Sequence, residues 1–500
     1  MRLSVATFFL IHATALSQPM AIEGDRLRAH IRFLSSDLLE GRGVGTRADK
    51  LTTEYLASAF AAAGAKPGGE NGTFFQTVPL TGVTTDPAST ISINGKNLQW
   101  KKDFVGSTQT EEANFKLSVP AVFVGHGIRA PEFGWDDYAG MNVQGKLVVL
   151  FTGEPPSDDP AFFGGKALTY YGRWTYKFEE AARQGAAAAI IIHTDATAGY
   201  GWSVLENSRD REEIQIRRQA SAPTLRFATW MTSTAAIAAG IPVNDLLRRA
   251  DEKGFGPSAL PFAIDLNIRS TFRPVESRNV VARIDGSDPK LSQDFVLYSA
   301  HWDHLGSRST GDDRVFNGAV DNATGTAMLI EVARAWAQLQ PRPRRSVLFV
   351  AVTAEESGLL GSEYFVSHPL VPVANIKVAL NVDSILPGGR PTGLRAAGAE
   401  NTPVWPQVQE AAKRFGLPVL PDPRPESGGF FRSDHFSFHR AGIPAFSING
   451  VGIPGEFAES YGAKRYHQLS DEYSESWDMT ANETISSLAL LLGVNIASLP

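Results

Sequence analysis

Imidazole, carboxylate and phenol side chains gather at several points in the C-terminal half of the sequence. Most of them follow an apolar run that is typical of a buried strand, as His301 follows Phe295–Ala300 and Glu355 follows Ser346–Thr353. The groups are His301, Asp303, His304, Asp321, Glu355, Glu356, Asp383, Tyr466 and His467. In open α/β sheets, ligands bind beyond the carboxyl ends of the strands, so we expect these side chains to converge there.

A cluster of carboxylates and imidazoles is the kind of ligand set that metal sites use. Like charges held close together are unfavourable unless a cation compensates them, and one or two divalent ions would do so. The chain has no cysteine, so nitrogen and oxygen atoms must hold the metal. This set suits zinc, manganese or cobalt better than calcium or magnesium. Two histidines with several carboxylates fit two ions that share one bridging carboxylate.

The adjacent residues Glu355 and Glu356 can serve two different purposes. Just after a strand, neighbouring side chains point in different directions, so one carboxylate can bind metal while the other faces the attacking water as a general base. The pattern therefore predicts hydrolysis by water that is activated at a metal centre.

The elements that must position these groups alternate between strand and helix over residues 275–500. Apolar runs rich in valine and leucine predict strands of a parallel sheet that is covered on both faces. They are Asn279–Ile284, Phe295–Ala300, Ser346–Thr353, Lys377–Asp383 and Ile443–Ile448. Helical patterns at Thr324–Leu339 and Val404–Phe415 lie between them. We therefore expect an α/β sandwich with right-handed crossovers.

The N-terminal half has a different character. Residues 21–110 begin with two amphipathic helical patterns, whereas residues 111–265 contain short apolar strands and one clear helical pattern, Lys177–Gln184. The glycine-rich segment Gly41–Gly45 lies between the first two helices. It does not match a phosphate-binding loop, because no strand precedes it and no lysine occupies the required place.

Residues 1–17 are typical of an export signal. Arg2 precedes the mostly apolar stretch Leu3–Leu16, and small residues offer a cleavage site after Ser17. No later run of about 20 apolar residues occurs, so no integral membrane segment is expected after removal of the signal. The net charge of −6, without a long basic run, gives no reason to expect nucleic-acid binding. We expect a secreted or periplasmic protein.

Four segments resemble motifs of the di-zinc exopeptidase family, which includes secreted bacterial leucine aminopeptidases, glutamate carboxypeptidase, transferrin receptor and glutaminyl cyclase. The segments are Ser299–Gly306, Asn317–Gly325, Thr353–Ser362 and Asn381–Asp383. Their occurrence together, in this order and at this spacing, is far more specific than any one of them. The resemblance covers residues 271–500 and, to a smaller extent, the N-terminal helices.

The middle region resembles the protease-associated domain that is inserted in many members of the family. Val122–Gly127 and Ala181–Ala186 carry this likeness. The resemblance implies the zinc exopeptidase fold, a mainly parallel sheet sandwiched by helices, with an inserted β-rich domain. The implied parts are a signal peptide at 1–17, the N-terminal part of the peptidase domain at 18–110, the protease-associated domain at 111–265 and the metallopeptidase core at 271–500.

The resemblance also implies a ligand set for two zinc ions in each chain. His301, Asp321 and Glu356 would bind one ion. Asp321, Asp383 and His467 would bind the other, so that Asp321 bridges the pair. Manganese or cobalt could take the place of zinc at such a site.

Other residues receive catalytic or supporting roles from the same resemblance. Glu355 would act as the general base and later as the proton donor. Asp303 would orient His301, and Tyr466 would stabilise the oxyanion. The peptide bond Asp321–Asn322 is often cis in the family.

Several further residues admit more than one interpretation. His435 lies in a segment that resembles a pocket-lining loop of the family, and either contacts substrate or is an ordinary loop histidine. Phe430 and Phe431 either line a hydrophobic specificity pocket or pack in the core. His126 and His193 in the middle region are expected to be structural.

The sequence thus predicts a secreted metallo-aminopeptidase that releases N-terminal residues from peptides with a free N-terminus. A dipeptidase or carboxypeptidase of the same fold is an alternative, and it would need a cation such as Arg432 or Arg465 to hold the substrate carboxylate. Glutaminyl cyclase, an acyltransferase that uses one metal ion, is another, although the complete ligand set favours two ions. A non-catalytic receptor is disfavoured because no ligand is missing.

Overall fold

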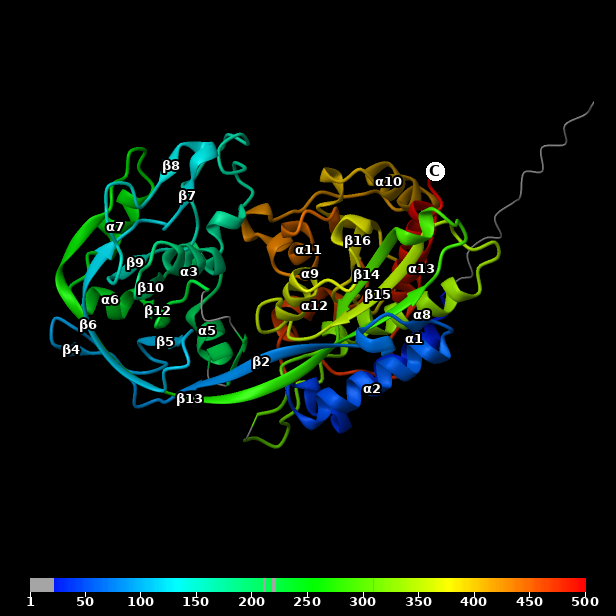
Figure 1. Ribbon diagram of the computed structural model, residues 1–500, viewed down its shortest axis with the longest axis horizontal. Coiled ribbons are helices and arrows are strands. Elements are labelled where there is room, and N and C mark those ends of the chain that lie inside the picture. Colours follow the sequence, from blue (N-terminus) through cyan, green and yellow to red (C-terminus); the bar gives the residue numbers. More distant parts are fainter. Residues whose placement is uncertain (1–21, 210–211, 218–221, 309) are drawn as a thin grey trace, which may run out of the picture.

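The computed structural model describes residues 22–209, 212–217, 222–308 and 310–500, and it has two lobes (Figure 1). The expected export signal at residues 1–17 lies outside these ranges. Each lobe has its own sheet, and the long strand β13 (Ser258–Ile284) belongs to both. No helix within these ranges is long and apolar enough to cross a membrane.

The sheet of the larger lobe has a parallel centre and antiparallel edges. Besides β13, its strands are β1 (Lys66–Pro67), β2 (Phe75–Thr85), β11 (Glu213–Ile216), β14 (Phe295–His301), β15 (Ser346–Val352), β16 (Ile376–Asn381), β17 (Gly393–Ala397) and β18 (Ala445–Val451). β14 pairs in parallel with β15 and β16, and β16 with β18. β17 is antiparallel to β18 at one edge, and β13 and β2 are antiparallel at the other.

Helices cover both faces of this sheet. They are α1 (Gly24–Leu34), α2 (Arg47–Ala62), α8 (Gly325–Ala337), α9 (Leu360–Ser367), α10 (Trp405–Arg414), α11 (His435–Arg440), α12 (Glu456–Lys464) and α13 (Thr480–Ala497). Side chains alternate between the faces of a strand, so Val296 and Tyr298 pack with α1, α2, α8 and α13, while Phe295 and Leu297 pack with α9 and α11. This is the expected α/β sandwich.

The smaller lobe is built on a second sheet. Its strands are β3 (Thr90–Ile93), β4 (Lys96–Asn97), β5 (Phe104–Ser107), β6 (Asn114–Phe123), β9 (Leu147–Leu150), β10 (Ala188–His193) and β12 (Phe227–Thr232), together with the first half of β13. β6, β9, β10 and β12 are parallel. β5 and β13 flank them in antiparallel pairing, and β3 and β4 continue the sheet beyond β13. The sheet includes strands that precede residue 111. That this region is of the protease-associated type stays a prediction.

Helices also cover the second sheet, and a short hairpin lies beside it. The helices are α3 (Trp174–Arg183), α4 (Asp195–Ala198), α5 (Trp202–Arg209), α6 (Ser233–Ala238) and α7 (Val243–Ala250), and the hairpin is β7 (Arg129–Ala130) with β8 (Trp135–Asp136). Alternate residues of β9 again belong to two different apolar clusters, Leu147 to one and Val148 to the other. Both sheets are therefore buried on both faces.

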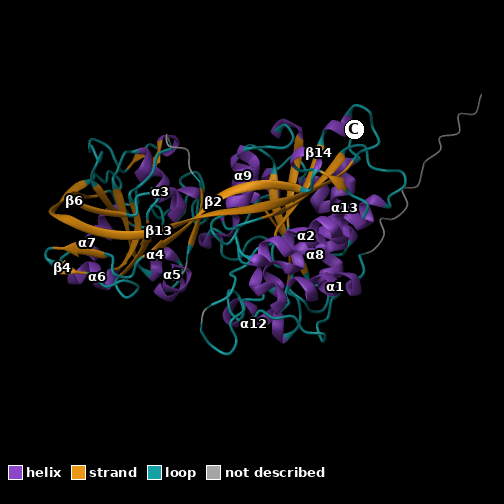
Figure 2. Cartoon of the chain, turned by 60° about the horizontal axis from the view of Figure 1, so that its bottom comes forward, coloured by secondary structure: helices purple, strands orange, loops and turns teal. Residues whose placement is uncertain are grey.

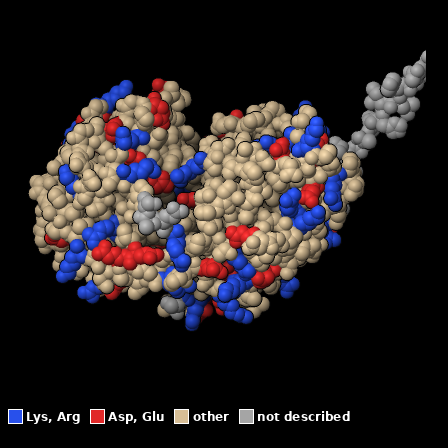
Figure 3. All heavy atoms as spheres, viewed as in Figure 1, with Lys and Arg blue, Asp and Glu red and all other residues tan. Residues whose placement is uncertain are grey.

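The lobes are joined at two places. β2 and β13 run from one lobe to the other as a pair of strands (Figure 2). At the other place, the N–H of Leu168 donates to the carbonyl oxygen of Pro425 at 3.1 Å, and the rings of Tyr170 and Phe436 lie 4.8 Å apart. The space-filling view shows an indentation between the lobes on this face, and acidic and basic side chains mixed over both (Figure 3).

The central elements of the larger lobe are those that the sequence predicts. β14, β15, β16 and β18 follow the apolar runs, and α8 and α10 lie within the predicted helices. β17 was not predicted, because its residues Gly393–Ala397 include a glycine and an arginine and form no apolar run. β13 is much longer than the predicted strand Asn279–Ile284, since it continues into the second sheet.

Candidate metal centre

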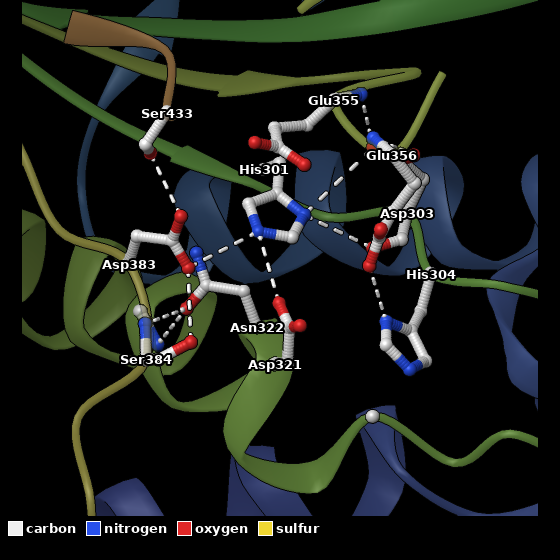
Figure 4. A network of polar contacts seen from close by, with 12 residues as sticks. His301, Asp303, His304, Asp321, Asn322, Glu355, Glu356, Asp383, Ser384 and Ser433 are labelled. Atoms are coloured by element: carbon white, nitrogen blue, oxygen red, sulfur yellow. Dashed lines mark hydrogen bonds and ion pairs between the residues drawn. The ribbon is translucent and has the colours of Figure 1, made fainter. Parts of the chain in front are cut away.

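The predicted site residues meet at the carboxyl ends of the parallel strands (Figure 4). His301 is the last residue of β14, Glu355 and Glu356 follow β15, Asp383 follows β16, Asp321 lies in the turn before α8, and His467 lies after α12. His301 and Asp321 are buried, so solvent screens their charges only weakly. Five chain segments far apart in the sequence thus contribute to one cluster.

Asp321 lies at the centre of the cluster. Its Oδ1 is 3.3 Å from Nε2 of His301, and its Oδ2 is 3.2 Å from Nε2 of His467. The same His301 nitrogen is 3.3 Å from Oδ1 of Asp383, and the same His467 nitrogen is 3.2 Å from Oε2 of Glu356. The two oxygens of one carboxylate therefore face two separate pairs of imidazole and carboxylate.

These contacts pair the ligands differently from the arrangement that the resemblance implied. We expected His301 with Glu356, and Asp383 with His467, but the shortest contacts join His301 to Asp383 and His467 to Glu356. β14 and β16 are hydrogen-bonded neighbours, so the residues just beyond their ends stand side by side, which chain order alone does not indicate. His301, Asp321 and Glu356 still offer atoms within 4.8 Å of one another, so the cluster is continuous.

The donor set fits a pair of divalent cations. Among the described residues, Asp321, Glu356 and Asp383 form ion pairs with imidazoles only. The buried Arg42 donates hydrogen bonds to backbone carbonyl groups instead. Buried carboxylates without a sufficient counter-charge are costly, and two divalent ions would supply that charge. Imidazole and carboxylate ligands suit zinc, manganese or cobalt.

The adjacent glutamates have opposite electrostatic surroundings. Burial raises the pKa of Glu355 well above its usual range, and the charges of Asp383 and Glu356 act in the same direction. Burial also acts to raise the pKa of Glu356, but the imidazoles of His467 and His304 lower it below its usual range. One carboxylate thus has the environment of a ligand and the other that of a proton acceptor and donor.

The pKa of His467 also reflects the negative charge of the cluster. Burial acts to lower its pKa, but the carboxylates of Glu356 and Asp321 raise the pKa to about 10. Without a metal ion, the ring therefore carries a proton at neutral pH and supplies positive charge beside the two carboxylates. A bound cation would supply that positive charge instead.

The carboxylate of Asp303 supports the turn that carries Glu355 and Glu356, rather than the ring of His301. Its carboxylate accepts the backbone N–H of Glu355 at 3.1 Å and that of Glu356 at 3.4 Å. Nδ1 of His301 lies 3.1 Å from the backbone oxygen of Asp303 but 4.0 Å from its carboxylate. The backbone carbonyl group of Asp303, and not its carboxylate, therefore orients the ring of His301. The neighbouring His304 has a different partner, since its Nδ1 contacts Oε1 of Glu356 at 2.6 Å.

Arg42 is a supporting residue that the sequence analysis missed. Its guanidinium donates to the carbonyl oxygens of Trp302 and Asn317 at 2.8 and 2.6 Å, and so ties together the loops that carry His301 and Asp321. A Cβ atom added to Gly41 would lie 2.2 Å from the carbonyl oxygen of Gly306. The glycine-rich segment Gly41–Gly45 thus lets Arg42 approach the site, and its sequence was the available signal.

A cavity of about 230 Å³ opens beside the cluster. Tyr466 and His467 line it together with Asp321, Glu355 and Asp383. Tyr466 is 39% exposed and stacks on the imidazole of His467 at a ring separation of 3.9 Å. Burial of the hydroxyl and the nearby Asp321 raise the pKa of Tyr466, so the phenol keeps its proton and can donate it in a hydrogen bond.

The structure distinguishes among the residues whose role was open. His435 and Phe430 line the cavity, whereas the ring of Phe431 packs against Tyr170 at 6.1 Å. Arg432 also lines the cavity. Arg465 is not among the lining residues, and its guanidinium lies over the ring of Phe457 at 4.2 Å.

The remaining expectations concern a peptide bond and two histidines. The bond Asp321–Asn322 is cis, as the resemblance implied. His126 contacts Asp251 at 2.8 Å and His193 contacts Asp195 at 3.2 Å, both in the smaller lobe. These histidines have local partners there, which agrees with a structural role.

The part of the chain that builds this site matches a known protein family. Residues 279–492 match peptidase family M28. A vacuolar membrane protease of Candida dubliniensis strain CD36 is 38% identical over 115 residues, 23% of this chain and 11% of the relative. Aminopeptidase YwaD of Bacillus subtilis strain 168 is 30% identical over 155 residues, 30% of each chain. The chain thus spans less than a third of the length of these relatives.

A solved structure resembles nearly the whole chain. The aminopeptidase from Aneurinibacillus sp. strain AM-1 has a TM-score of 0.56 and 20% sequence identity, and the alignment covers 94% of this chain and 93% of that protein. At this identity the likeness concerns the fold, and it extends over both lobes. The match to peptidase family M28, residues 279–492, contains all of the clustered carboxylates and imidazoles.

Proposed function

We propose that this protein is an aminopeptidase that holds two zinc ions. The observation that carries the proposal is the position of Asp321, whose two carboxylate oxygens face His301 and His467 separately. Asp383 stands beside the first imidazole and Glu356 beside the second, so each ion would have three protein ligands. Three protein ligands with an open position are typical of catalytic zinc sites.

The chain's own residues would perform the proton transfers. Bound zinc ions supply Lewis-acid activation of water and of the scissile carbonyl group. Glu355 accepts a proton from the attacking water and later donates a proton to the leaving amine, a role that suits its raised pKa. Tyr466 donates a hydrogen bond to the developing oxyanion, and Asp303 holds the turn that carries Glu355.

A free substrate amine fits this cavity better than a blocked one. Asp383 and Glu355 line the cavity, and their carboxylates would attract an ammonium group. The volume of about 230 Å³ is below the roughly 300–1,000 Å³ of typical ligand sites, so it suits one residue rather than a length of chain. The Bacillus and Aneurinibacillus proteins are both named as aminopeptidases, which supports the same choice.

A panel of substrates with free and blocked ends tests this proposal. The zinc-loaded protein should cleave aminoacyl-p-nitroanilides and leave their N-acetyl counterparts intact, and a chelator should abolish the activity. Metal analysis should find about two ions per chain. Cleavage only of peptides with a free C-terminus would identify a carboxypeptidase or dipeptidase instead. Ring closure of N-terminal glutamine with loss of ammonia, by a protein with one ion, would identify a glutaminyl cyclase.

Two further parts of the proposal concern the remainder of the chain. We propose that residues 1–17 direct export and are removed, which mass spectrometry of exported protein would show as a new N-terminus near Gln18. We also propose that the smaller lobe is of the protease-associated type and limits the size of substrates. The contact between Tyr170 and Phe436, beside the cavity-lining loop, supports that role. Long peptides that are cleaved as fast as dipeptides would contradict it.

A further inference from the structure

Part of the cavity wall comes from the antiparallel pair β17 and β18. Arg395 is paired with Asn449, and Ala397 with Ser447. All four residues line the cavity, as expected when alternate residues of a strand share one face. The small side chains of Ala397 and Ser447 leave space for a substrate group, and the long side chain of Arg395 lies beside that space.

The guanidinium group of Arg395 lacks an acidic partner. No described residue forms an ion pair or hydrogen bond with it, and its Nε atom is buried. Asp422 lines the same cavity, but it is exposed and its Oδ1 accepts the backbone N–H of Arg424. A buried guanidinium nitrogen without an acceptor is unfavourable, so this position favours an anion from outside the chain.

His435 provides a second, independent sign of a ligand. It is 2% exposed, it lines the cavity, and neither of its ring nitrogens has a hydrogen-bond partner among the described residues. The ring of Phe430 meets it edge-on at 4.8 Å and restricts its orientation. Burial lowers the pKa of His435 to about 4, so the ring is neutral at pH 7 and keeps one N–H donor.

We propose that Arg395 and His435 form a subsite for a substrate carboxylate, and that the expected source is the side chain of an N-terminal glutamate or aspartate. The guanidinium supplies a fork of donors that matches a carboxylate, and the neutral imidazole supplies one more. The inference rests on the proposed aminopeptidase function, since it names the substrate class of that same site. It differs from a hydrophobic specificity pocket, the role considered above for Phe430.

The unmodified protein gives the first test. Glutamyl- and glutaminyl-p-nitroanilide differ in charge but hardly in size, and leucyl-p-nitroanilide serves as the apolar reference. We expect kcat/KM to be roughly 10- to 100-fold higher for glutamyl than for glutaminyl substrate, the range of a charge-assisted hydrogen bond. A ratio near one, with efficient cleavage of the leucyl substrate, would overturn the N-terminal acidic side chain as the source of the carboxylate but not the proposed function. No cleavage of any of the three would overturn the proposed function itself.

A second pair of substrates separates the two possible sources of the carboxylate. Leucylglycine carries a C-terminal carboxylate, and leucylglycinamide does not. A preference for leucylglycine that depends on Arg395, with equal rates for glutamyl and glutaminyl substrates, would support the subsite and assign it to the peptide C-terminus. Absence of a preference in both pairs would overturn the subsite.

Substitutions then connect the preference to Arg395. Arg395→Met should bring the glutamyl-to-glutaminyl ratio close to one, and Arg395→Lys should keep part of it because the charge remains without the fork. Arg414→Met is the control, since Arg414 is 58% exposed on α10 and pairs with Glu410. An unchanged ratio in an Arg395→Met variant with normal zinc content and melting temperature would overturn the assignment.

Discussion

Both lobes bury a cluster of ionisable groups beside a doubly covered sheet, but the two clusters are satisfied in different ways. In the smaller lobe, Asp137 accepts a hydrogen bond from the indole of Trp135 at 2.7 Å. Glu154 accepts the backbone N–H of Thr169 at 2.8 Å and also its hydroxyl group. The buried Lys177 donates to a backbone carbonyl group at 2.7 Å. Neutral donors and one cation therefore satisfy that cluster from within the protein.

In the cluster of the larger lobe, carboxylates share the same imidazoles: His301 contacts Asp321 and Asp383, and His467 contacts Asp321 and Glu356. The carboxylate of Asp321 contacts two imidazoles, and no hydrogen bond from a neutral donor reaches it among the described residues. The two groups of side chains close enough to share a metal ion, within the described ranges, both lie here. Carboxylates that share imidazoles, rather than the presence of buried charge, thus distinguish the candidate cation site from the structural cluster.

The substitution Asp321→Asn tests this distinction most strongly. An amide is a poor metal ligand, and this residue would touch both ions, so the variant should lose both ions and all measurable peptidase activity. Metal analysis after gel filtration, together with an anilide assay, measures the two effects. The matched control is Asp137→Asn in the smaller lobe, which should keep both metal and activity. If the two variants behaved alike, the comparison between the clusters would be wrong.

The next largest effect is expected for Glu355→Gln. This change removes proton transfer, which typically contributes roughly 10²–10⁴ in rate, so kcat should fall by at least that range while KM changes little. The metal content should stay nearly normal, because the residue is assigned as the base and not as a ligand.

Glu356→Gln is the control for that experiment. It should lose metal, since Oε2 of Glu356 lies 3.2 Å from the imidazole of His467 at the proposed site. Loss of metal from the Glu355 variant, with normal metal in the Glu356 variant, would mean that the two roles are reversed.

A smaller effect is expected for Asp303→Asn. The amide can accept one of the two backbone N–H bonds from Glu355 and Glu356 but holds the turn less firmly than a carboxylate. Loss of a group that orients metal ligands typically costs about 10- to 100-fold in metal affinity or activity. Zinc titration with a competing chelator and the anilide assay measure both quantities, and normal values in both would show that other contacts hold the turn.

The smallest effect on catalysis is expected for Lys177→Met, which should instead change stability. Burial lowers the pKa of Lys177 from 10.5 to about 7, so between these values the folded state binds fewer protons than the unfolded state. The lysine's contribution to the free energy of unfolding therefore becomes more favourable as pH rises from 7 to 10. Each pKa unit corresponds to about 1.4 kcal/mol, so we expect a change on the order of 2–4 kcal/mol relative to the variant.

Denaturant unfolding of both proteins at pH 7, 8.5 and 10 measures this difference. The stability of the wild type relative to Lys177→Met should increase across the series, and the anilide activity of the variant should stay within about twofold because the lysine lies outside the site. Parallel stability curves would show that burial does not lower the pKa of Lys177.

Local sequence patterns predicted the centre of the fold and the residues of the candidate site. The apolar runs of β14, β15 and β16 are short and continuous, so their ends, and hence the positions of His301, Glu355 and Asp383, could be recognised without the structure. A strand that is buried on both faces is a continuous apolar run, so the sequence alone is enough to recognise it.

Spatial neighbours were harder to predict. The contact of His301 with Asp383 depends on which strands are adjacent in the sheet, and the sequence does not state that order. Arg395 was overlooked because β17 is an edge strand without an apolar run, and its place in the cavity depends on its register with β18. The carboxylate of Asp303 supports a turn 52 residues further along the chain, a contact without any local signal.

The strand β13 has a consequence for how this architecture can be cut or transplanted. Its 27 residues pair with β6 and β3 in one lobe and with β2 and β15 in the other. A deletion of the smaller lobe through this strand would leave an exposed edge of unpaired N–H and C=O groups, a template for aggregation. The smaller lobe is therefore not a separable insertion, and a shortened version of the protein would need a new sheet edge as well as fewer residues.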